Sequence, residues 1–242
     1  MKLDVLAFGV HPDDIELSCG GALLVEKKGG KKTGIIDLTQ GELGTRGTAE
    51  TRMDESTQAG LILKVDAREN LKMKDGFLSN DESHQRRIIE MIRKYQPEII
   101  FCNATEDRHP DHGRSASLVS DSSFLSGLVK IETNSAGERQ KPWRPKYVFH
   151  YIQDRYLKPD FVLDISDVFE QKIEAVRAYR TQFFNPDVEG PQTYISTPGF
   201  IESIVYRAKM FGKLIGVEYA EGFTTAKAIG IKSLDAFILK DT

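Results

Sequence analysis

Cysteine is scarce in this sequence: Cys19 and Cys102 are the two cysteines among 242 residues. Both lie in apolar surroundings, so we expect buried free thiols in a reducing compartment rather than a disulfide. The residues are 40% hydrophobic and 29% charged, which is ordinary for a soluble globular protein. A chain of this length therefore has enough apolar material to fold without disulfides, as one large domain or two small ones.

Excess positive charge is also absent. The chain has 33 Lys and Arg against 36 Asp and Glu, which gives a formal net charge of −3. Proteins that bind nucleic acid usually present a basic surface. We therefore expect no nucleic-acid partner.

Long apolar runs are missing as well. The apolar run nearest the N-terminus, Leu3–Val10, is too short to span a membrane, and acidic residues occur near both its ends. It does not have the pattern of a signal peptide. We expect a cytoplasmic protein with no membrane partner.

Apolar segments of strand length alternate with segments of helical periodicity. The strand segments are almost continuously apolar, which suits a parallel sheet covered on both faces. The expected strands are Leu3–Val10, Gly34–Leu38, Glu98–Cys102, Lys146–Tyr151 and Phe161–Ile165, and the expected helices are Ile15–Lys28, Thr48–Leu63, His84–Tyr95, Val168–Phe184 and Ile201–Ile215. This alternation predicts a doubly wound α/β fold. Asn134–Pro145 and Asn185–Gly199 have the composition of long loops, which are often functional.

Two similar motifs follow the first and third expected strands. HPDD, residues 11–14, comes directly after the first strand, and HPDH, residues 109–112, lies in the loop after the third. Three of the five histidines of the chain fall in these two motifs. Ligands of open α/β sheets bind beyond the carboxyl ends of the strands. We therefore expect both motifs at one edge of the sheet.

The paired motifs predict a metal site. A catalytic zinc ion needs three protein ligands and an open position, and His11, Asp14 and His112 supply two nitrogens and one oxygen. Asp13 then lies beside the metal, free to take a proton from the attacking water. Proline and aspartate are also common in turns, so HPDD alone fits an ordinary turn. The second motif, after another strand, favours the metal site.

Three segments in this order, AFGVHPDD, ETRMDESTQAG and RHPDHG, resemble the LmbE-like, or PIG-L, family of zinc-dependent N-acetylglucosamine deacetylases. The resemblance spans most of the chain. It implies a Rossmann-like, doubly wound, mostly parallel sheet with helices on both faces, in a single domain over residues 1–242. The stretch from Tyr194 to Phe223 also resembles the C-terminal part of the bacillithiol-biosynthesis deacetylases, which act on N-acetyl-α-D-glucosaminyl L-malate.

The resemblance implies a role for each motif residue. His11, Asp14 and His112 become the ligands of one Zn²⁺ per subunit, with Fe²⁺ as the alternative metal. Asp13 becomes the general base. His109 becomes the residue that stabilises the oxyanion or assists the leaving group.

Four further residues are expected to contact the substrate or to orient a histidine. Asp111 lies where the family orients a histidine, Arg52 matches an arginine of the sugar site, and Tyr194 matches a tyrosine of a mobile C-terminal loop. Arg52 and Arg108 are cationic groups near the motifs and are suited to pairing with the malate carboxylates. In the bacillithiol subgroup, the resemblance also implies a homohexamer.

The expected reaction is therefore hydrolysis of the N-acetyl amide of an N-acetylglucosaminide, most specifically the malate glucosaminide. One alternative is a related metal-dependent amidase that acts on a thiol conjugate or another N-acyl amino sugar, because only the rim of the site would differ. Another is a non-catalytic protein that binds a metal and a sugar. Asp13 argues against the second alternative, because a structural metal site has no need of a free carboxylate beside the metal.

Overall fold

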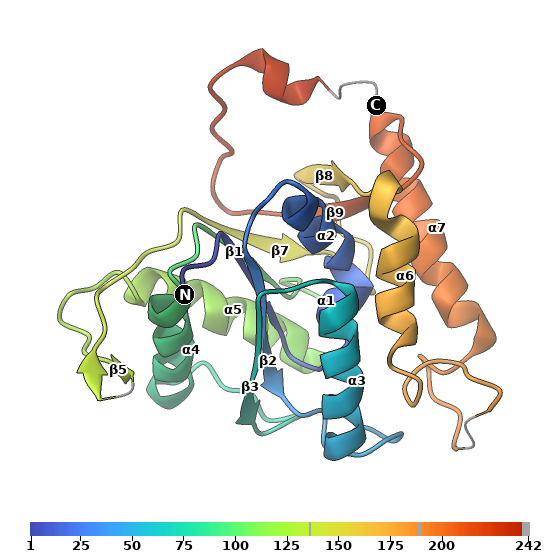
Figure 1. Cartoon of the computed structure of the whole chain (residues 1–242), viewed down its shortest axis with the longest axis horizontal. Coiled ribbons are helices and arrows are strands. Elements are labelled where there is room, and N and C mark those ends of the chain that lie inside the picture. Colours follow the sequence, from blue (N-terminus) through green and yellow to red (C-terminus); the bar gives the residue numbers. More distant parts are fainter. Residues whose placement is uncertain (136, 188–189, 239–242) are drawn as a thin grey trace.

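The computed structural model describes residues 1–135, 137–187 and 190–238 and contains a seven-stranded sheet (Figure 1). The strands β2, β1, β4 and β7 pair in parallel, as do β2 and β3, whereas β9 runs antiparallel to β7 and β8. In spatial order the strands are β3 (Ala67–Met73), β2 (Thr33–Thr39), β1 (Val5–Gly9), β4 (Ile99–Cys102), β7 (Tyr147–Tyr151), β9 (Ala220–Thr224) and β8 (Phe161–Asp164).

Helices cover both faces of this sheet. The helices are α1 (Asp14–Ser18), α2 (Gly20–Lys28), α3 (Ala49–Ile62), α4 (Glu82–Tyr95), α5 (Pro110–Leu125), α6 (Phe169–Arg177) and α7 (Pro198–Ile215), with short 3-10 turns at Ser166–Val168 and Leu234–Phe237. In Figure 1, α4 and α5 lie on one side of β1 and β2, and α1, α3 and α6 lie on the other. The predicted α/β fold, with a mostly parallel sheet flanked by helices, is confirmed.

The two cores follow from the alternation of side chains along β1. Val5 and Ala7 pack into the core shared with α2, α3 and α6, whereas Leu6 and Phe8 pack into the core shared with α4 and α5. Successive side chains of a strand point to opposite faces, so a continuously apolar strand fills both layers. Cys19 and Cys102 are free and buried in these cores.

Several elements depart from the sequence expectation. The expected helix Ile15–Lys28 is two helices that meet at Cys19. The expected helix Val168–Phe184 is shorter, because α6 ends at Arg177. A small hairpin of β5 (Asn134–Ser135) and β6 (Glu138–Arg139) lies in the expected loop Asn134–Pro145. Strands β3 and β9 and helix α5 were not predicted.

The carboxyl ends of β1, β2, β3, β4 and β7 meet at one edge of the sheet, because these strands are parallel. HPDD follows β1 and leads into α1, and HPDH forms the first turn of α5 after β4. Within the described part of the chain, no helix is long and apolar enough to cross a membrane.

Candidate active site

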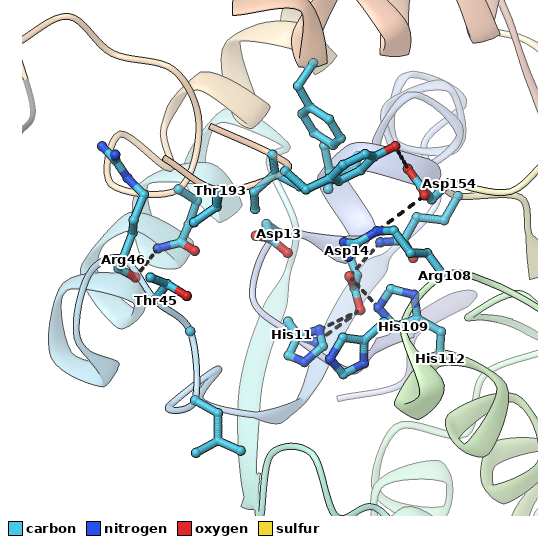
Figure 2. A pocket seen from close by; sticks show the side chains of 18 of the residues that line it. His11, Asp13, Asp14, Thr45, Arg46, Arg108, His109, His112, Asp154 and Thr193 are labelled. Atoms are coloured by element: carbon cyan, nitrogen blue, oxygen red, sulfur yellow. Dashed lines mark hydrogen bonds and ion pairs between the residues drawn. The ribbon is translucent and has the colours of Figure 1, made fainter. Parts of the chain in front are cut away.

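Three histidines from the two motifs converge at this edge of the sheet. One ring nitrogen each from His11, His109 and His112 lies within 4.8 Å of the others. Figure 2 shows the three imidazole rings gathered beside the carboxylate of Asp14. The convergence predicted from the two strand ends is therefore present. Together the three rings form a cluster able to hold a divalent metal.

Asp14 adds an oxygen donor to this cluster. Its Oδ1 lies 3.3 Å from Nε2 of His112, and its Oδ2 lies 3.8 Å from Nδ1 of His11. Nε2 of His112 is buried and makes no hydrogen bond to any described residue. A divalent cation between Nε2 and the Asp14 carboxylate would satisfy both buried polar groups. The donor set of two imidazole nitrogens and one carboxylate oxygen therefore fits a divalent metal such as zinc.

Two aspartates that the sequence did not reveal hold the outer nitrogens of the histidine rings. Nε2 of His11 donates to Oδ1 of Asp75 over 3.0 Å, and Nδ1 of His112 donates to Oδ2 of Asp107 over 2.6 Å. Carboxylate partners of this kind fix the tautomer and orientation of metal-binding histidines. Each ring thus turns its other nitrogen, Nδ1 of His11 and Nε2 of His112, towards Asp14.

The same carboxylates control the protonation of the two rings. Burial lowers the pKa of His11, but its contacts with Asp14 and Asp75 outweigh burial and raise its pKa to about 9. Burial also lowers the pKa of His112, but Asp14 and Asp107 outweigh burial and raise this pKa to about 10. Burial raises the pKa of Asp14, yet the charge of His112 and the contacts with both rings bring it well below its usual range. This site therefore attracts positive charge.

Asp13 occupies a strained position beside the cluster. Its φ is 129°, a conformation that favours glycine, and its side chain is buried. Arg52 of α3 donates to Oδ2 of Asp13 over 3.0 Å and to the carbonyl of Pro12 over 2.7 Å. Burial raises the pKa of Asp13 to about 7, although the charge of Arg52 opposes the rise. Such strain and such a pKa are typical of functional carboxylates.

His109 caps the N-terminus of α5. Its Nδ1 accepts a hydrogen bond from the backbone N–H of Asp111 over 3.2 Å, and Pro110 occupies the first helical position. Burial and the charges of His11 and His112 lower the pKa of His109. The ring is therefore neutral near pH 7, with its proton on Nε2, because Nδ1 accepts.

Among the described residues, the carboxylate of Asp111 makes no hydrogen bond to a histidine ring. Its Oδ1 accepts from Nη1 of Arg114 over 2.7 Å, and its buried Oδ2 makes no hydrogen bond to any residue that the structure describes. The carboxylates that contact the histidine rings are those of Asp75, Asp107 and Asp14.

The cluster lies at the bottom of a cavity of about 310 Å³. Its rim carries Arg108 and Tyr194, whose side chains are about half exposed. Nε of Arg108 lies 3.4 Å from Oδ2 of Asp154, the hydroxyl of Tyr194 donates to Oδ1 of Asp154 over 3.1 Å, and the guanidinium lies 4.5 Å from the tyrosine ring centre. Figure 2 shows Arg108 and Asp154 across the cavity from Thr45 and Arg46. The structure thus brings together all the predicted site residues except the carboxylate of Asp111.

Comparison with known proteins agrees with this geometry. The family model described as GlcNAc-PI de-N-acetylase, PIG-L, matches residues 6–122. The solved structure of the conserved protein TT1542 from Thermus thermophilus superposes with a TM-score of 0.84 at 34% identity, covering 95% of this chain and 98% of that one. The chain belongs to the PIG-L family.

Two further relatives are deacetylases. The diacetylchitobiose deacetylase of Thermococcus kodakarensis is 28% identical over 229 residues, which cover 90% of this chain and 81% of that protein. The structure of N,N'-diacetylchitobiose deacetylase from Pyrococcus horikoshii superposes with a TM-score of 0.78 at 25% identity, covering 91% and 82% of the two chains. This protein is accordingly a PIG-L family deacetylase, a hydrolase of amide bonds, with a histidine cluster able to hold a divalent metal.

Proposed function

We propose that the substrate is N-acetyl-α-D-glucosaminyl L-malate and that His11, Asp14 and His112 hold one Zn²⁺ per subunit, with Fe²⁺ as the alternative metal. The observation that carries the metal assignment is that the buried Nε2 of His112 faces Oδ1 of Asp14 over 3.3 Å and makes no hydrogen bond to a described residue. The products are acetate and the free 2-amino sugar.

The metal, when bound, polarises the acetyl carbonyl and makes water a stronger acid. Asp13 accepts the proton of the attacking water, since its pKa of about 7 leaves it ready to exchange a proton near neutral pH. Arg52 keeps the Asp13 carboxylate in place, because it also binds the backbone carbonyl of Pro12. After the attack, protonated Asp13 can return its proton to the departing amine.

His109 offers a second hydrogen-bond donor beside the cluster. Its Nδ1 accepts from the backbone of α5, so the Nε2 proton of the neutral ring is available to the oxyanion. Hydrogen-bond donors aimed at a developing charge are often the largest contribution to catalysis. We assign no direct catalytic role to the carboxylate of Asp111, which accepts a hydrogen bond from the Arg114 side chain in the first turns of α5.

Two features support a malate aglycone. The segment from Tyr194 to Phe223 resembles that of the bacillithiol-biosynthesis deacetylases, and Tyr194 lies on the cavity rim. Arg108 is a half-exposed cation beside it. A guanidinium binds carboxylates in a bidentate manner. Diacetylchitobiose, the substrate in the names of two relatives, has no carboxylate for Arg108 to bind.

A panel of substrates tests this assignment. Acetate release would be measured for N-acetylglucosaminyl malate, diacetylchitobiose, free N-acetylglucosamine and an N-acetylglucosaminyl thiol conjugate. We expect the highest kcat/KM for the malate glycoside, and we expect Arg108→Ala to reduce that preference. A higher kcat/KM for diacetylchitobiose, or equal values for the malate glycoside and free N-acetylglucosamine, would reject the malate assignment.

We also propose that residues 1–242 form one domain that assembles as a homohexamer in the cytoplasm. The exposed apolar side chains of Tyr206, Met210 and Leu214 recur every four residues along α7 and give a surface for contacts between subunits. Light scattering should find six times the 27.2 kDa chain mass.

A further inference from the structure

The carboxylate of Asp14 is held by more groups than the metal site alone requires. Its Oδ2 accepts from the backbone N–H groups of Val10 and His11, over 2.9 and 3.1 Å, and from Nδ2 of Asn103 over 3.0 Å. Its Oδ1 accepts from Nε2 of Gln153 over 2.7 Å. A carboxylate oxygen with three donors around it has little room left for a metal, so Oδ1 is the oxygen that remains available.

Gln153 is placed so that only its amino group faces Asp14. The residue follows β7, lines the cavity and is 6% exposed. Its Oε1 accepts from Nδ2 of Asn103 over 3.4 Å, which fixes the orientation of its amide. The reverse orientation would place an amide oxygen against the Asp14 carboxylate, and two acceptors repel each other. Gln153 and Asn103 therefore form a buried amide pair that contacts both oxygens of Asp14.

The backbone of Asn103 is fixed from the neighbouring strand β7. Nδ1 of His150, in β7, lies 2.8 Å from the backbone oxygen of Asn103, which follows β4. The amide side chain of Asn103 is fully buried. The amide pair is thus anchored to two neighbouring strands, and it cannot rotate away from Asp14 without breaking buried hydrogen bonds.

We propose that Gln153, supported by Asn103, is a positioning residue that aims Oδ1 of Asp14 at the metal and so sets the metal affinity of the site. This inference rests on the proposed metal ligands. Without the Gln153 donor, Oδ1 loses the hydrogen bond that fixes its direction, while Oδ2 stays bound to its three N–H donors. Loss of a group that hydrogen-bonds to a metal ligand and orients it typically weakens metal affinity by about 10–100-fold.

The test is a zinc titration of purified full-length protein in competition with a chelating dye. Gln153→Met keeps the side-chain length and removes the donor, and we expect it to weaken Zn²⁺ binding about 10–100-fold. Gln153→Asn keeps a buried amide but is one methylene too short to reach Asp14, so it should weaken binding similarly. The thermal unfolding temperature of the metal-free variants, measured in parallel, shows that both still fold.

Gln182→Met is the matched control. Gln182 is also a buried glutamine that lines the cavity, but its amide donates to the backbone oxygen of Arg46 and to Thr181 instead of a metal ligand. We expect wild-type zinc affinity for this variant. Co²⁺ loading adds a spectroscopic readout: a changed direction of Oδ1 in Gln153→Met alters the visible Co²⁺ absorption, which should stay as in the wild type in Gln182→Met.

The inference is overturned if both Gln153 variants bind Zn²⁺ as tightly as the wild type, or if Gln182→Met weakens binding equally. It also falls if the wild type binds no divalent metal. Failure of the proposed function is a separate observation, namely that metal-loaded wild-type protein releases no acetate from the malate glycoside.

Discussion

Asp13 and Asp14 are neighbours in the chain but meet different surroundings. Asp14 is enclosed by N–H donors and two imidazole rings, and its pKa lies well below the usual range. Asp13 accepts a hydrogen bond from the guanidinium of Arg52 and has a pKa of about 7 because it is buried. Neighbouring carboxylates with pKa values pushed apart are suited to separate tasks. Asp14 is suited to bind a metal and Asp13 to exchange a proton.

Exchange of the Asp13 carboxylate for an amide tests this division. Asp13→Asn keeps the shape and leaves His11, Asp14 and His112 in place, so zinc content should remain at the wild-type level. An amide does not accept the proton of the attacking water, and kcat should fall roughly 10²–10⁴-fold. Asp14→Ala should instead lose metal as well as activity. The measurement is metal content beside turnover for both variants. If Asp13→Asn lost its metal and Asp14→Ala kept it, the two roles would be reversed.

The histidines predict proton release on metal binding. Without metal, His11 and His112 have pKa values of about 9 and 10, so both rings are protonated at neutral pH. A metal binds the neutral ring, so each ring must give up a proton. Calorimetric titrations with Zn²⁺ near pH 7, in buffers of different ionisation enthalpy, should show release of about two protons per metal. Affinity should therefore rise with pH until about pH 10. Proton release near zero would contradict these pKa values.

At the scale of elements, α3 stabilises the turn between β1 and α1 through the hydrogen bonds of Arg52. Arg52 on α3 reaches the Pro12 carbonyl, the Gly41 carbonyl and the Asp13 carboxylate. Gly41 is held at positive φ, and a Cβ there would lie 2.0 Å from Nη1 of Arg52. The loop after β2 and the loop after β1 are thus connected through one guanidinium.

Removal of this guanidinium should change the pH dependence of catalysis. The charge of Arg52 lowers the pKa of Asp13, so Arg52→Ala raises that pKa. Since Asp13 must be deprotonated to act as a base, the acid limb of the kcat/KM profile should move to higher pH. Arg52→Lys keeps the charge and should move the limb less. An acid limb unchanged in Arg52→Ala would show that it does not report Asp13.

The helices and strands differ in how well their positions could be predicted from the sequence. Strands β1, β2 and β4 were predictable because they are buried on both faces and therefore apolar. Strand β3 has the sequence ARENLKM and is only partly buried, so it lacks an apolar pattern. Helix α5 contains five serines and a glycine, which have low helix propensity, and its first turn is the HPDH motif.

The site was predictable to the extent that it depends on local sequence. HPDD and HPDH could be recognised as donor motifs because HPDD directly follows an apolar strand and HPDH lies in the loop after another. Asp75, Asp107 and Gln153 carry no such signal. Asp75 lies 64 residues from His11 and Gln153 lies 139 residues from Asp14, so only the folded sheet brings these partners together.

At the scale of the whole molecule, the site depends on a buried junction where Glu221 of β9 meets Lys172 of α6 and the N-terminus of α2. Glu221 of β9 accepts from the backbone N–H groups of Gly21 and Ala22, over 3.0 and 2.7 Å, and from Nζ of Lys172 in α6 over 2.5 Å. A Cβ on Gly21 would lie 2.8 Å from Cδ1 of Ile165, so glycine permits this close packing. The junction fixes α2, and α2 follows directly on α1, which begins at Asp14.

This junction should contribute strongly to stability. The side chains of Lys172 and Glu221 are 2% and 3% exposed, so removing one leaves the other buried without its charge partner. Loss of one partner of a buried ion pair costs about 3–5 kcal/mol. Glu221→Ala should lie in this range, because it also removes the acceptor for two N–H groups of α2. Lys172→Met should cost less, because Glu221 keeps those two donors and remains at the N-terminus of a helix.

Urea unfolding of the metal-free protein measures both changes, and a surface pair provides the control. Lys28 and Asp167 lie 2.7 Å apart but are 65% and 59% exposed. Exposed pairs contribute about 0–1 kcal/mol, so Lys28→Met should leave the free energy of unfolding nearly unchanged. A loss in Glu221→Ala no larger than in Lys28→Met would mean that the junction does not stabilise the fold. A larger loss in Lys172→Met than in Glu221→Ala would mean that the ion pair, and not the N-terminus of α2, is the main stabilising contact.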